Sequence, residues 1–309
     1  MGYQINLRGA VSRSIRRTYR RRLEKIGRVL AKAGPDAERI HEARTSVKKA
    51  RALLRLLRHD LGASLFEAET AALREAGRAL STVRDAVVLV EALDGLTPEG
   101  SEEDRAALAP LRAALAARRD RCVERSDEEA ARAARAVAGA LERADEVVPA
   151  HHGWKALARG LDRAYRRTRV RAERAFTTGG DEDLHALRKA VKDLTYQARF
   201  LRPLDEPALR AEGAGFAQLG DLLGDDHDLA VLRAVASRPG EDADPAARAR
   251  LDALTAARRA ELEREAQSLA ERLLAEPPAL RLARLESAFR AARDRAQRGE
   301  GEAPVPHFA

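Results

Sequence analysis

The sequence predicts an all-α protein that consists of two pseudo-symmetric antiparallel four-helix bundles produced by an internal duplication. Three observations support this prediction. The strong helix formers Ala, Leu, Arg and Glu make up most of the long uninterrupted segments. Apolar residues recur at helical spacing along almost the whole chain, and no segment shows the alternation of an exposed strand. Blocks from the first half also return, in the same order, in the second half.

Proline and glycine separate the predicted helices of the first half. Val11, Ile15 and Tyr19 share one face of a first helix, which ends before Pro35 because proline does not continue a helix. The stretch Gly95–Ser101 has the composition of a loop. We expect the other helical segments of this half over residues 37–60, 64–93 and 102–147.

Similar breaks divide the second half. Pro203 and Pro277-Pro278 mark helix ends, and Gly224–Asp226 is a candidate break inside a longer helix. We expect helices over residues 151–177, 181–202, 207–237, 245–275 and 279–298. A boundary near residue 148 gives domains over 1–148 and 149–298, and we expect the tail at 299–309 to be disordered.

The internal repeat is clearest in the second helix of each half. The block His41–Lys48 returns as His185–Lys192 at an offset of 144 residues, and Leu80–Leu89 returns as Leu223–Leu232 at an offset of 143. Arginine rows in the first helices match at an offset of 146. In that register Arg13, Arg17, Arg20 and Arg21 fall on Arg159, Arg163, Arg166 and Arg167. Three matching blocks in one order indicate a duplication.

The chain carries a formal net charge of +8, which favours a negatively charged partner such as nucleic acid, an anionic membrane surface or polymeric phosphate. Its single cysteine, Cys122, excludes an internal disulfide and fits a reducing cytoplasm. We expect no secretory signal and no membrane span, because no apolar run approaches the roughly 18 residues that a span needs. We also expect no cofactor.

The placement of the charge is more informative than its total. His41, Arg44, Lys48 and Arg55 lie within roughly a sixth of the helix circumference, at about 100° per residue. The second half repeats this stripe with His185, Arg188, Lys192 and Arg199, and Tyr196 lies on the same line. Crowded like charges destabilise an isolated helix, so a polyanion or facing carboxylates would stabilise each stripe. The alternative is that each stripe is a solvated helix face.

The first helix of each half adds an arginine row. If the first two helices of a half form an antiparallel hairpin, the row and the stripe line one groove. Guanidinium groups make bidentate contacts to phosphate, and ammonium groups act as compact point charges. Imidazole contributes a donor whose charge changes near neutral pH. This combination of residue types favours a phosphate-rich polyanion as the ligand.

Two motif pairs give a more specific indication. The patterns HxxRxxxKK at His41–Lys49 and HxxRKxxK at His185–Lys192 resemble the CHAD family, the conserved-histidine α-helical domain. Leu80–Leu89 and Leu222–Leu232 resemble that family's LGxxRDxxVL signature. The resemblance extends over residues 8–298, and it implies two pseudo-symmetric four-helix bundles with a basic pocket that binds inorganic polyphosphate.

The resemblance also implies which residues line that pocket. With the arginine rows, the candidate polyphosphate-binding residues are Arg13, Arg17, Arg20, Arg21, His41, Arg44, Lys48, Lys49, Arg51, Arg55, Arg159, Arg163, Arg166, Arg167, His185, Arg188, Lys189, Lys192, Tyr196 and Arg199. Lys48 and Lys49 stand where the family often has arginine. His227 replaces the arginine of the signature, so the surroundings of Asp85 and Asp228 need not match. We expect a stand-alone member, because the ExExK motif of the CYTH domain that often precedes CHAD is missing.

We therefore expect a non-enzymatic, cytoplasmic protein that binds polyphosphate and associates with polyphosphate granules. Binding of nucleic acid or another polyanion, a metal-dependent hydrolase of polyphosphate or phosphate esters, and an adaptor for acidic proteins are the alternatives. The sequence has few aromatic residues and no nucleic-acid recognition motif, histidine metal cluster or glycine-rich phosphate loop. Asp85, Asp225, Asp226 and Asp228 could hold Mg²⁺, or they could cap a helix or orient neighbouring arginines.

Overall fold

The computed structural model describes residues 3–32, 36–96, 102–237 and 245–300, and within these ranges it contains eleven α-helices, two short 3₁₀ helices and no strand. The all-α prediction is therefore confirmed. The helices are α1 (Val11–Leu30), α2 (Ala37–Leu56), α3 (Ala63–Ala79), α4 (Ser81–Asp94), α5 (Glu102–Glu124), α6 (Ser126–Glu142), η1 (Ala144–Glu146), α7 (Lys155–Thr178), α8 (Asp181–Leu201), η2 (Arg202–Leu204), α9 (Glu206–Ala236), α10 (Pro245–Leu273) and α11 (Pro278–Gln297).

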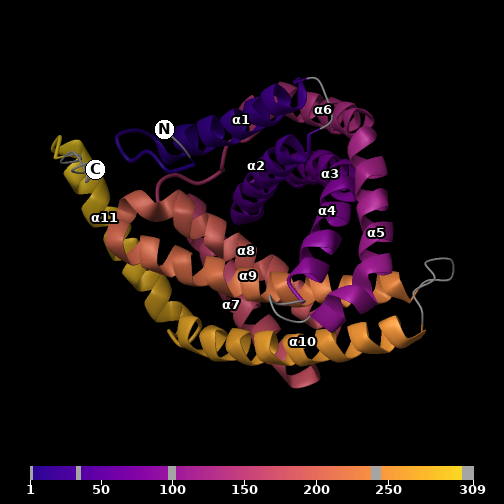
Figure 1. Ribbon diagram of the computed structural model, residues 1–309. Coiled ribbons are helices and arrows are strands. Elements are labelled where there is room, and N and C mark those ends of the chain that lie inside the picture. Colours follow the sequence, from indigo (N-terminus) through magenta and orange to yellow (C-terminus); the bar gives the residue numbers. More distant parts are fainter. Residues whose placement is uncertain (1–2, 33–35, 97–101, 238–244, 301–309) are drawn as a thin grey trace, which may run out of the picture.

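The helices form an outer ring around an inner group (Figure 1). In that view α1, α6, α5, α10 and α11 run around the outside, while α2, α4, α8 and α9 lie inside. The two halves of the chain meet in the inner group, because α2 packs against α7 and α8, and α4 packs against α9. Helices from both halves therefore surround the same central region.

Helix α1 buries its apolar face and leaves its arginine row in solvent. Ile15 and Tyr19 are fully buried, whereas Arg13 and Arg17 are exposed. Burying one large apolar side chain contributes roughly 1.5–3 kcal/mol, which is enough to orient the helix. The largest apolar core contains side chains from α1, α2, α7 and α8, so it crosses the predicted domain boundary. The boundary near residue 148 and the duplication stay predictions.

Two predicted helical segments are each broken at one residue. The third predicted helix is two helices, because Leu80 adopts φ −85° and ψ 0° and ends α3. The long segment before residue 148 breaks at Arg125, with φ −89° and ψ 5°. In contrast, α9 runs unbroken through Gly224–Asp226, so the candidate break there is wrong. Gly224 is buried against Arg188 of α8, and the glycine serves this close approach of the two helices.

In the first half, a buried tyrosine joins three helical elements. The Tyr19 hydroxyl of α1 donates to the carboxylate of Glu69 in α3, which is fully buried. The other oxygen of that carboxylate accepts a 2.8 Å hydrogen bond from Nε of Arg143, which follows α6. Because the buried charge is paired and hydrogen-bonded, it fixes the positions of α1, α3 and α6.

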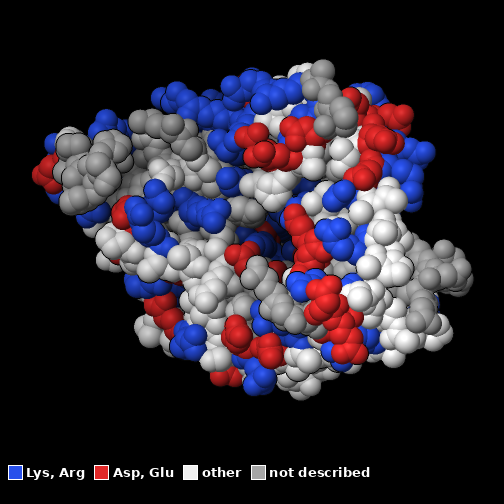
Figure 2. All heavy atoms as spheres, viewed as in Figure 1, with Lys and Arg blue, Asp and Glu red and all other residues white. Residues whose placement is uncertain are grey.

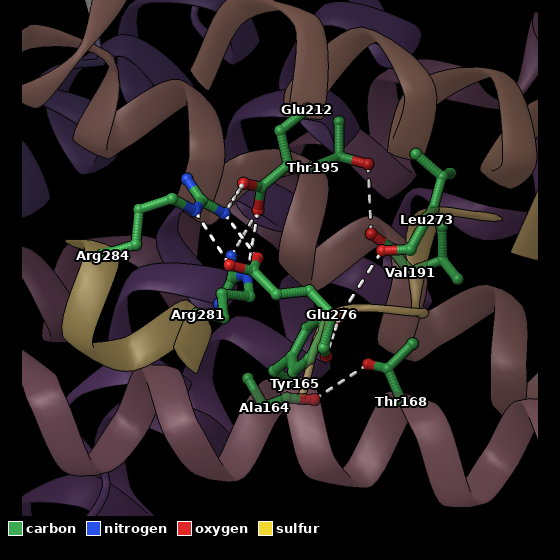
Figure 3. Close-up of polar contacts among 10 residues, drawn as sticks. All are labelled: Ala164, Tyr165, Thr168, Val191, Thr195, Glu212, Leu273, Glu276, Arg281 and Arg284. Carbon is green, nitrogen blue, oxygen red and sulfur yellow. Dashed lines mark hydrogen bonds and ion pairs between the residues drawn. The ribbon is translucent and has the colours of Figure 1, made fainter. Parts of the chain in front are cut away.

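Figure 3 shows a related network in the second half. Arg281 of α11 lies 4.6 Å from the centre of the Tyr165 ring and pairs with Glu212 of α9. The Tyr165 hydroxyl donates to the backbone carbonyl of Glu276 at 3.0 Å, and Arg284 pairs with both Glu212 and Glu276. In the predicted repeat, Tyr165 matches Tyr19 of the first-half network, and Glu212 matches Glu69.

The chain enters α1 through an extended segment that sequence reasoning missed. Tyr3, Ile5 and Leu7 are buried, and the residues between them are exposed. The Ile5 N–H donates to the Phe200 carbonyl at 2.8 Å, and the Tyr3 hydroxyl donates to the Lys49 carbonyl at 2.8 Å. The period-2 alternation is present in the sequence, so the expectation that no segment alternates is wrong here.

No helix of the described residues combines the length and apolar character that crossing a bilayer requires. The expectation of a disordered tail falls mainly on residues 301–309, and the loop expected at 95–101 falls mainly on 97–101. Both of these stretches lie outside the described residues.

Candidate polyanion-binding site

Five basic side chains meet where α2, α4, α8 and α9 come together, and we call them the central cluster. They are Arg44 and Lys48 of α2, Arg84 of α4, and Arg188 and Lys192 of α8. The charges of the other four members all lie near enough to Lys48 to lower its pKa. Figure 2 shows a depression in this region, with basic and acidic side chains around it. The structure thus brings the middle parts of the two basic stripes, Arg44 with Lys48 and Arg188 with Lys192, to one place.

Helix α9 supports the α8 side of the cluster with two glycines that are one helical turn apart. A Cβ added at Gly220 would lie 2.9 Å from Cε of Lys192, and one added at Gly224 would lie 3.2 Å from Nη2 of Arg188. Because these positions have no side chain, the two basic side chains lie directly against α9. The glycines therefore determine where the two charges are held.

The arginines that match in the predicted repeat have different partners. Nη1 of Arg44 donates to the Leu80 carbonyl at 2.9 Å, and Nη2 lies 3.6 Å from Oδ1 of Asp85. Arg188 has no hydrogen bond or ion pair to a described residue, and its Nε is buried without a partner. An unsatisfied buried donor costs about 1–3 kcal/mol, so Arg188 would be stabilised by an added acceptor.

Lys48 also lacks an ion pair in the part of the chain that the structure describes. Loss of hydration lowers its pKa, and the charges of Arg44, Arg188 and Lys192 lower it further, from an ordinary value of 10.5 to about 8. An anion bound in the depression would oppose this charge effect and favour the protonated amine. The cluster is therefore arranged to gain from an anionic ligand.

Three histidines border the central cluster. His185 of α8 stacks on His227 of α9, with ring centroids 4.1 Å apart. Burial and the neighbouring His227 lower the pKa of His185 to about 4. Burial also lowers the pKa of His41, and the charge of Arg84 adds to this effect. The rings of His41 and His185 are therefore neutral at pH 7 and can both donate and accept hydrogen bonds.

Carboxylates stand beside the cations at the edge of the depression. Oδ1 of Asp221 in α9 lies 2.8 Å from Nζ of Lys192, and the Asp221 side chain is 71% exposed. Asp225 and Asp228 follow on the next two turns of α9. Their pKa values are raised because burial disfavours the charged carboxylate. The site therefore contains mixed charges, with Asp221 open to solvent and Asp228 partly buried.

The aspartates considered as metal ligands in the sequence do not gather at one point. Asp226 forms an ion pair with Arg259 of α10 at 2.7 Å and is buried, and Asp85 faces Arg44. Among the described residues there is no group of three or more side chains that could hold a metal ion. These two aspartates thus orient arginines, which was one of the alternatives left open by the sequence.

A second basic region lies on the α7 side of the stripes. Buried Asp193 of α8 pairs with Arg55 of α2 and with Arg167 of α7, the latter at 3.0 Å. The charges of Arg55 and Asp193 act on Arg51, and the charge of Arg51 in turn lowers the pKa of Lys189. An open hollow of about 510 Å³ adjoins it and is lined by His59, Arg159, Asp162, Arg163, Arg166, Arg167, Val170 and Arg171. The arginine row of α7 therefore adjoins the stripe of α2.

The arginine row of α1 has different surroundings. Arg20 pairs with Asp145 of η1 at 2.6 Å, Arg13 and Arg17 are exposed, and Arg21 is half-buried. Within the described residues, no α1 side chain is among the main charged neighbours of Arg44 or Lys48 in the central cluster. Ligand binding by this row stays a prediction.

Three further predicted residues form a separate group. Lys49 lies on a different side of α2 from Lys48, where the charges of Arg22 and Arg199 lower its pKa in addition to burial. The Arg199 guanidinium lies 6.0 Å from the centre of the buried Tyr196 ring. Their contribution to binding also stays a prediction.

Sequence reasoning missed three side chains that border the basic regions. Arg84 enters the central cluster from α4, His227 stacks on His185, and His59 lines the α7 hollow. Arg84 and His227 occupy the same position of the downstream repeat block, which the sequence shows, but that match alone does not indicate that they reach the basic stripes. No pattern in the sequence distinguishes His59.

Comparisons with known proteins agree with this architecture. The sequence matches the family model of the CHAD domain over residues 8–237. The fold resembles the crystal structure of the CHAD domain from the plant Ricinus communis, with a TM-score of 0.60, 18% identity, and coverage of 95% of this chain and 93% of that chain. It also resembles PptA from Streptomyces chartreusis, with a TM-score of 0.58, 16% identity, and coverage of 93% and 100%. No curated protein sequence gives a significant match.

Proposed function

The chain belongs to the CHAD domain family, and we propose that it binds inorganic polyphosphate through the central cluster. The arginines on the α7 side, with Lys189, would extend the site along the ligand. Association of the protein with polyphosphate granules would follow from such binding. The polyphosphate pocket implied by the family resemblance supports the choice of ligand.

One observation carries the proposal. Lys48 and Arg188 are neighbouring cations without ion pairs, and three further cations surround them. The nearby carboxylates of Asp85 and Asp228 offset part of the repulsion between these cations, and a bound anion would offset more of it. A polyphosphate chain has negative charge along its whole length, so it would contact several of these side chains at once. A single small anion would neutralise fewer of them.

We propose binding without catalysis. The central cluster supplies charge and hydrogen-bond donors, which suit retention of a phosphate chain. A phosphate-release assay with polyphosphate and Mg²⁺ or Mn²⁺ tests this part of the proposal. We expect no release above background. Release that is abolished by the substitution Arg188→Gln would instead establish the hydrolase alternative.

The binding proposal is tested by titrating the protein with polyphosphate of defined chain length at several salt concentrations. The log of the affinity should fall steeply and linearly with log salt between about 50 and 200 mM, by analogy with nucleic acids. Duplex DNA added as a competitor should displace polyphosphate only weakly. A nearly flat salt dependence, or preferential binding of DNA, would contradict the proposal.

A further inference from the structure

The acidic side chain of Asp221 occupies a position where a phosphate group would contact Lys192. Its Oδ1 lies 2.8 Å from the lysine ammonium, and this is the only ion pair that either residue forms with a described residue. The Lys192 side chain is 27% exposed and that of Asp221 is 71% exposed, so the pair is open to solvent and to ligands. One cation of the central cluster is thus already neutralised by the protein itself.

The pairing follows from the local structure of α9. Gly220 precedes Asp221, and its missing side chain lets Lys192 lie against the helix, with its ammonium next to the carboxylate. Lys48 and Arg188, in the same cluster, have no such carboxylate partner among the described residues. The cluster therefore contains two unpaired cations and, beside them, a cation held by an internal counter-ion.

A ligand that reaches the whole cluster meets both kinds of cation. Its phosphates can contact Lys48 and Arg188 directly, but at Lys192 they must replace the carboxylate. The free energy of that contact is the difference between two similar ion pairs, so it is small. The displaced Asp221 carboxylate also remains close to the ligand and repels it.

We infer that Asp221 is an internal competitor that a bound polyphosphate chain displaces from Lys192, and that it limits the affinity of the site. The inference rests on the proposed function, because it concerns the same ligand and the same cluster. It assigns to Asp221 a role opposite to that of a residue that orients Lys192 for binding. The two roles predict changes of opposite sign when the carboxylate is neutralised.

The test is the substitution Asp221→Asn, which keeps the shape of the side chain and removes its charge. Binding of long-chain polyphosphate is measured by calorimetry in EDTA at fixed ionic strength. We expect the affinity to increase about 1.5- to fivefold, the size of effect that an exposed charge pair produces. Glu286→Gln is the matched control, because it removes one charge from an ion pair with Arg290 on α11. This control should change the affinity much less.

Repeating the Asp221 substitution in a second variant distinguishes displacement of Asp221 from Lys192 from simple repulsion between Asp221 and the ligand. In a Lys192→Gln protein there is no ammonium to compete for, so Asp221→Asn should increase the affinity by clearly less than in the wild-type background. An unchanged or weaker affinity in Asp221→Asn alone, with an unchanged melting temperature, would overturn the inference and make Asp221 a positioning residue. If the wild-type protein does not bind polyphosphate, the proposed function itself fails.

Discussion

Arg44 and Arg188 stand at matching positions of the predicted repeat, yet the protein uses them differently. In the first half the chain breaks at Leu80, and the freed carbonyl accepts a hydrogen bond from Arg44. In the second half α9 continues through the matching position, Leu223, so no carbonyl is freed. Arg188 lies against Gly224 instead and has a buried Nε without a partner.

This difference separates a structural role from the proposed ligand-binding role within one cluster. Arg44 donates a hydrogen bond to the Leu80 carbonyl at the α3–α4 junction, and it also faces Asp85. Arg188 has no such partner among the described residues, so its guanidinium is available to an anion. Similar sequence motifs therefore do not give equal contributions to binding, and each arginine must be judged by its partners.

The largest expected effect comes from replacing these two arginines separately. Arg188→Met should weaken polyphosphate binding roughly ten- to hundredfold, the equivalent of losing one or two charge-assisted hydrogen bonds, without lowering the melting temperature. Arg44→Met should weaken binding and also lower the free energy of unfolding by about 1–3 kcal/mol, because the Leu80 carbonyl loses its partner. Calorimetry and thermal melting measure both quantities. Equal loss of stability in the two variants would remove the distinction.

The second prediction concerns Lys48, whose protonated form is disfavoured in the folded protein. Its pKa is about 8 when folded and near 10.5 when unfolded, so the folded state binds fewer protons between these values. Lys48→Met should therefore stabilise the ligand-free protein at pH 7, by up to about 1 kcal/mol, because Lys48 keeps enough exposed surface for water to screen its charge. The gain should disappear as the pH rises from about 8 to 10.5.

The same substitution should weaken polyphosphate binding several-fold at pH 7, because one cation of the central cluster is lost. A variant that becomes more stable while it binds less tightly is the pattern expected of a binding residue. Denaturant unfolding and calorimetry at the same pH measure the two effects. If Lys48→Met destabilises the protein at pH 7 and leaves binding intact, the role of Lys48 is structural.

The third prediction is a pH dependence that comes from the histidines. The folded-state pKa of His185 is about 4, below its ordinary value of 6.5, so the ligand-free protein should lose stability as the pH falls through this window. A bound polyanion favours the imidazolium form, so affinity should rise as the pH falls from roughly 7.5 to 5.5. The variant with His41→Gln, His185→Gln and His227→Gln should lose this dependence below pH 7, while the part above pH 7 that comes from Lys48, with its pKa of about 8, should remain.

The control for this experiment is the choice of ligand. The terminal phosphates of a polyphosphate chain also titrate in this range, so a long chain with few ends is used at fixed ionic strength. If the triple variant has the same pH dependence as the wild-type protein, the histidines only support the fold.

The smallest expected effect on polyphosphate affinity comes from a substitution in α9 where it contacts Lys192. Gly220→Ala would place a Cβ 2.9 Å from Cε of Lys192, so the flexible lysine must move. We expect about two- to fivefold weaker binding, less than one charged hydrogen bond, and a melting temperature that does not fall, because alanine favours the helix. Gly213→Ala on the same helix meets only Ala198 and is the matched control. Equal effects of both substitutions would exclude a positioning role.

The helices and the basic stripes could be predicted from the sequence because both depend on local periodicity. His41, Arg44 and Lys48 repeat as a helical stripe, and the structure places the Arg44 and Lys48 positions of both halves in one cluster. The break at Leu80 could not be predicted, because the hydrogen bond that its carbonyl accepts comes from Arg44 of α2, which is distant in the sequence. The pairing of Arg20 with Asp145 is equally non-local, so no local pattern separates the α1 row from the α7 row.

The central claim is that binding depends on the unpaired cations of the cluster rather than on the positive charge of the whole protein. The most direct test compares two double variants that remove equal charge. The first variant, Lys48→Gln with Arg188→Gln, removes the two cations of the cluster that have no ion pair with a described residue. Arg264→Gln with Arg272→Gln removes two exposed arginines whose hydrogen bonds to described residues lie within α10.

Both variants and the wild-type protein are titrated with polyphosphate of one defined length at one salt concentration. The account predicts at least about a hundredfold loss of affinity for the cluster variant, from two lost charged contacts. The α10 variant should lose less than about threefold in affinity, because salt screens the interaction between its distant charges and the ligand. Equal losses in the two variants would show that net charge alone binds the ligand, and would contradict the account.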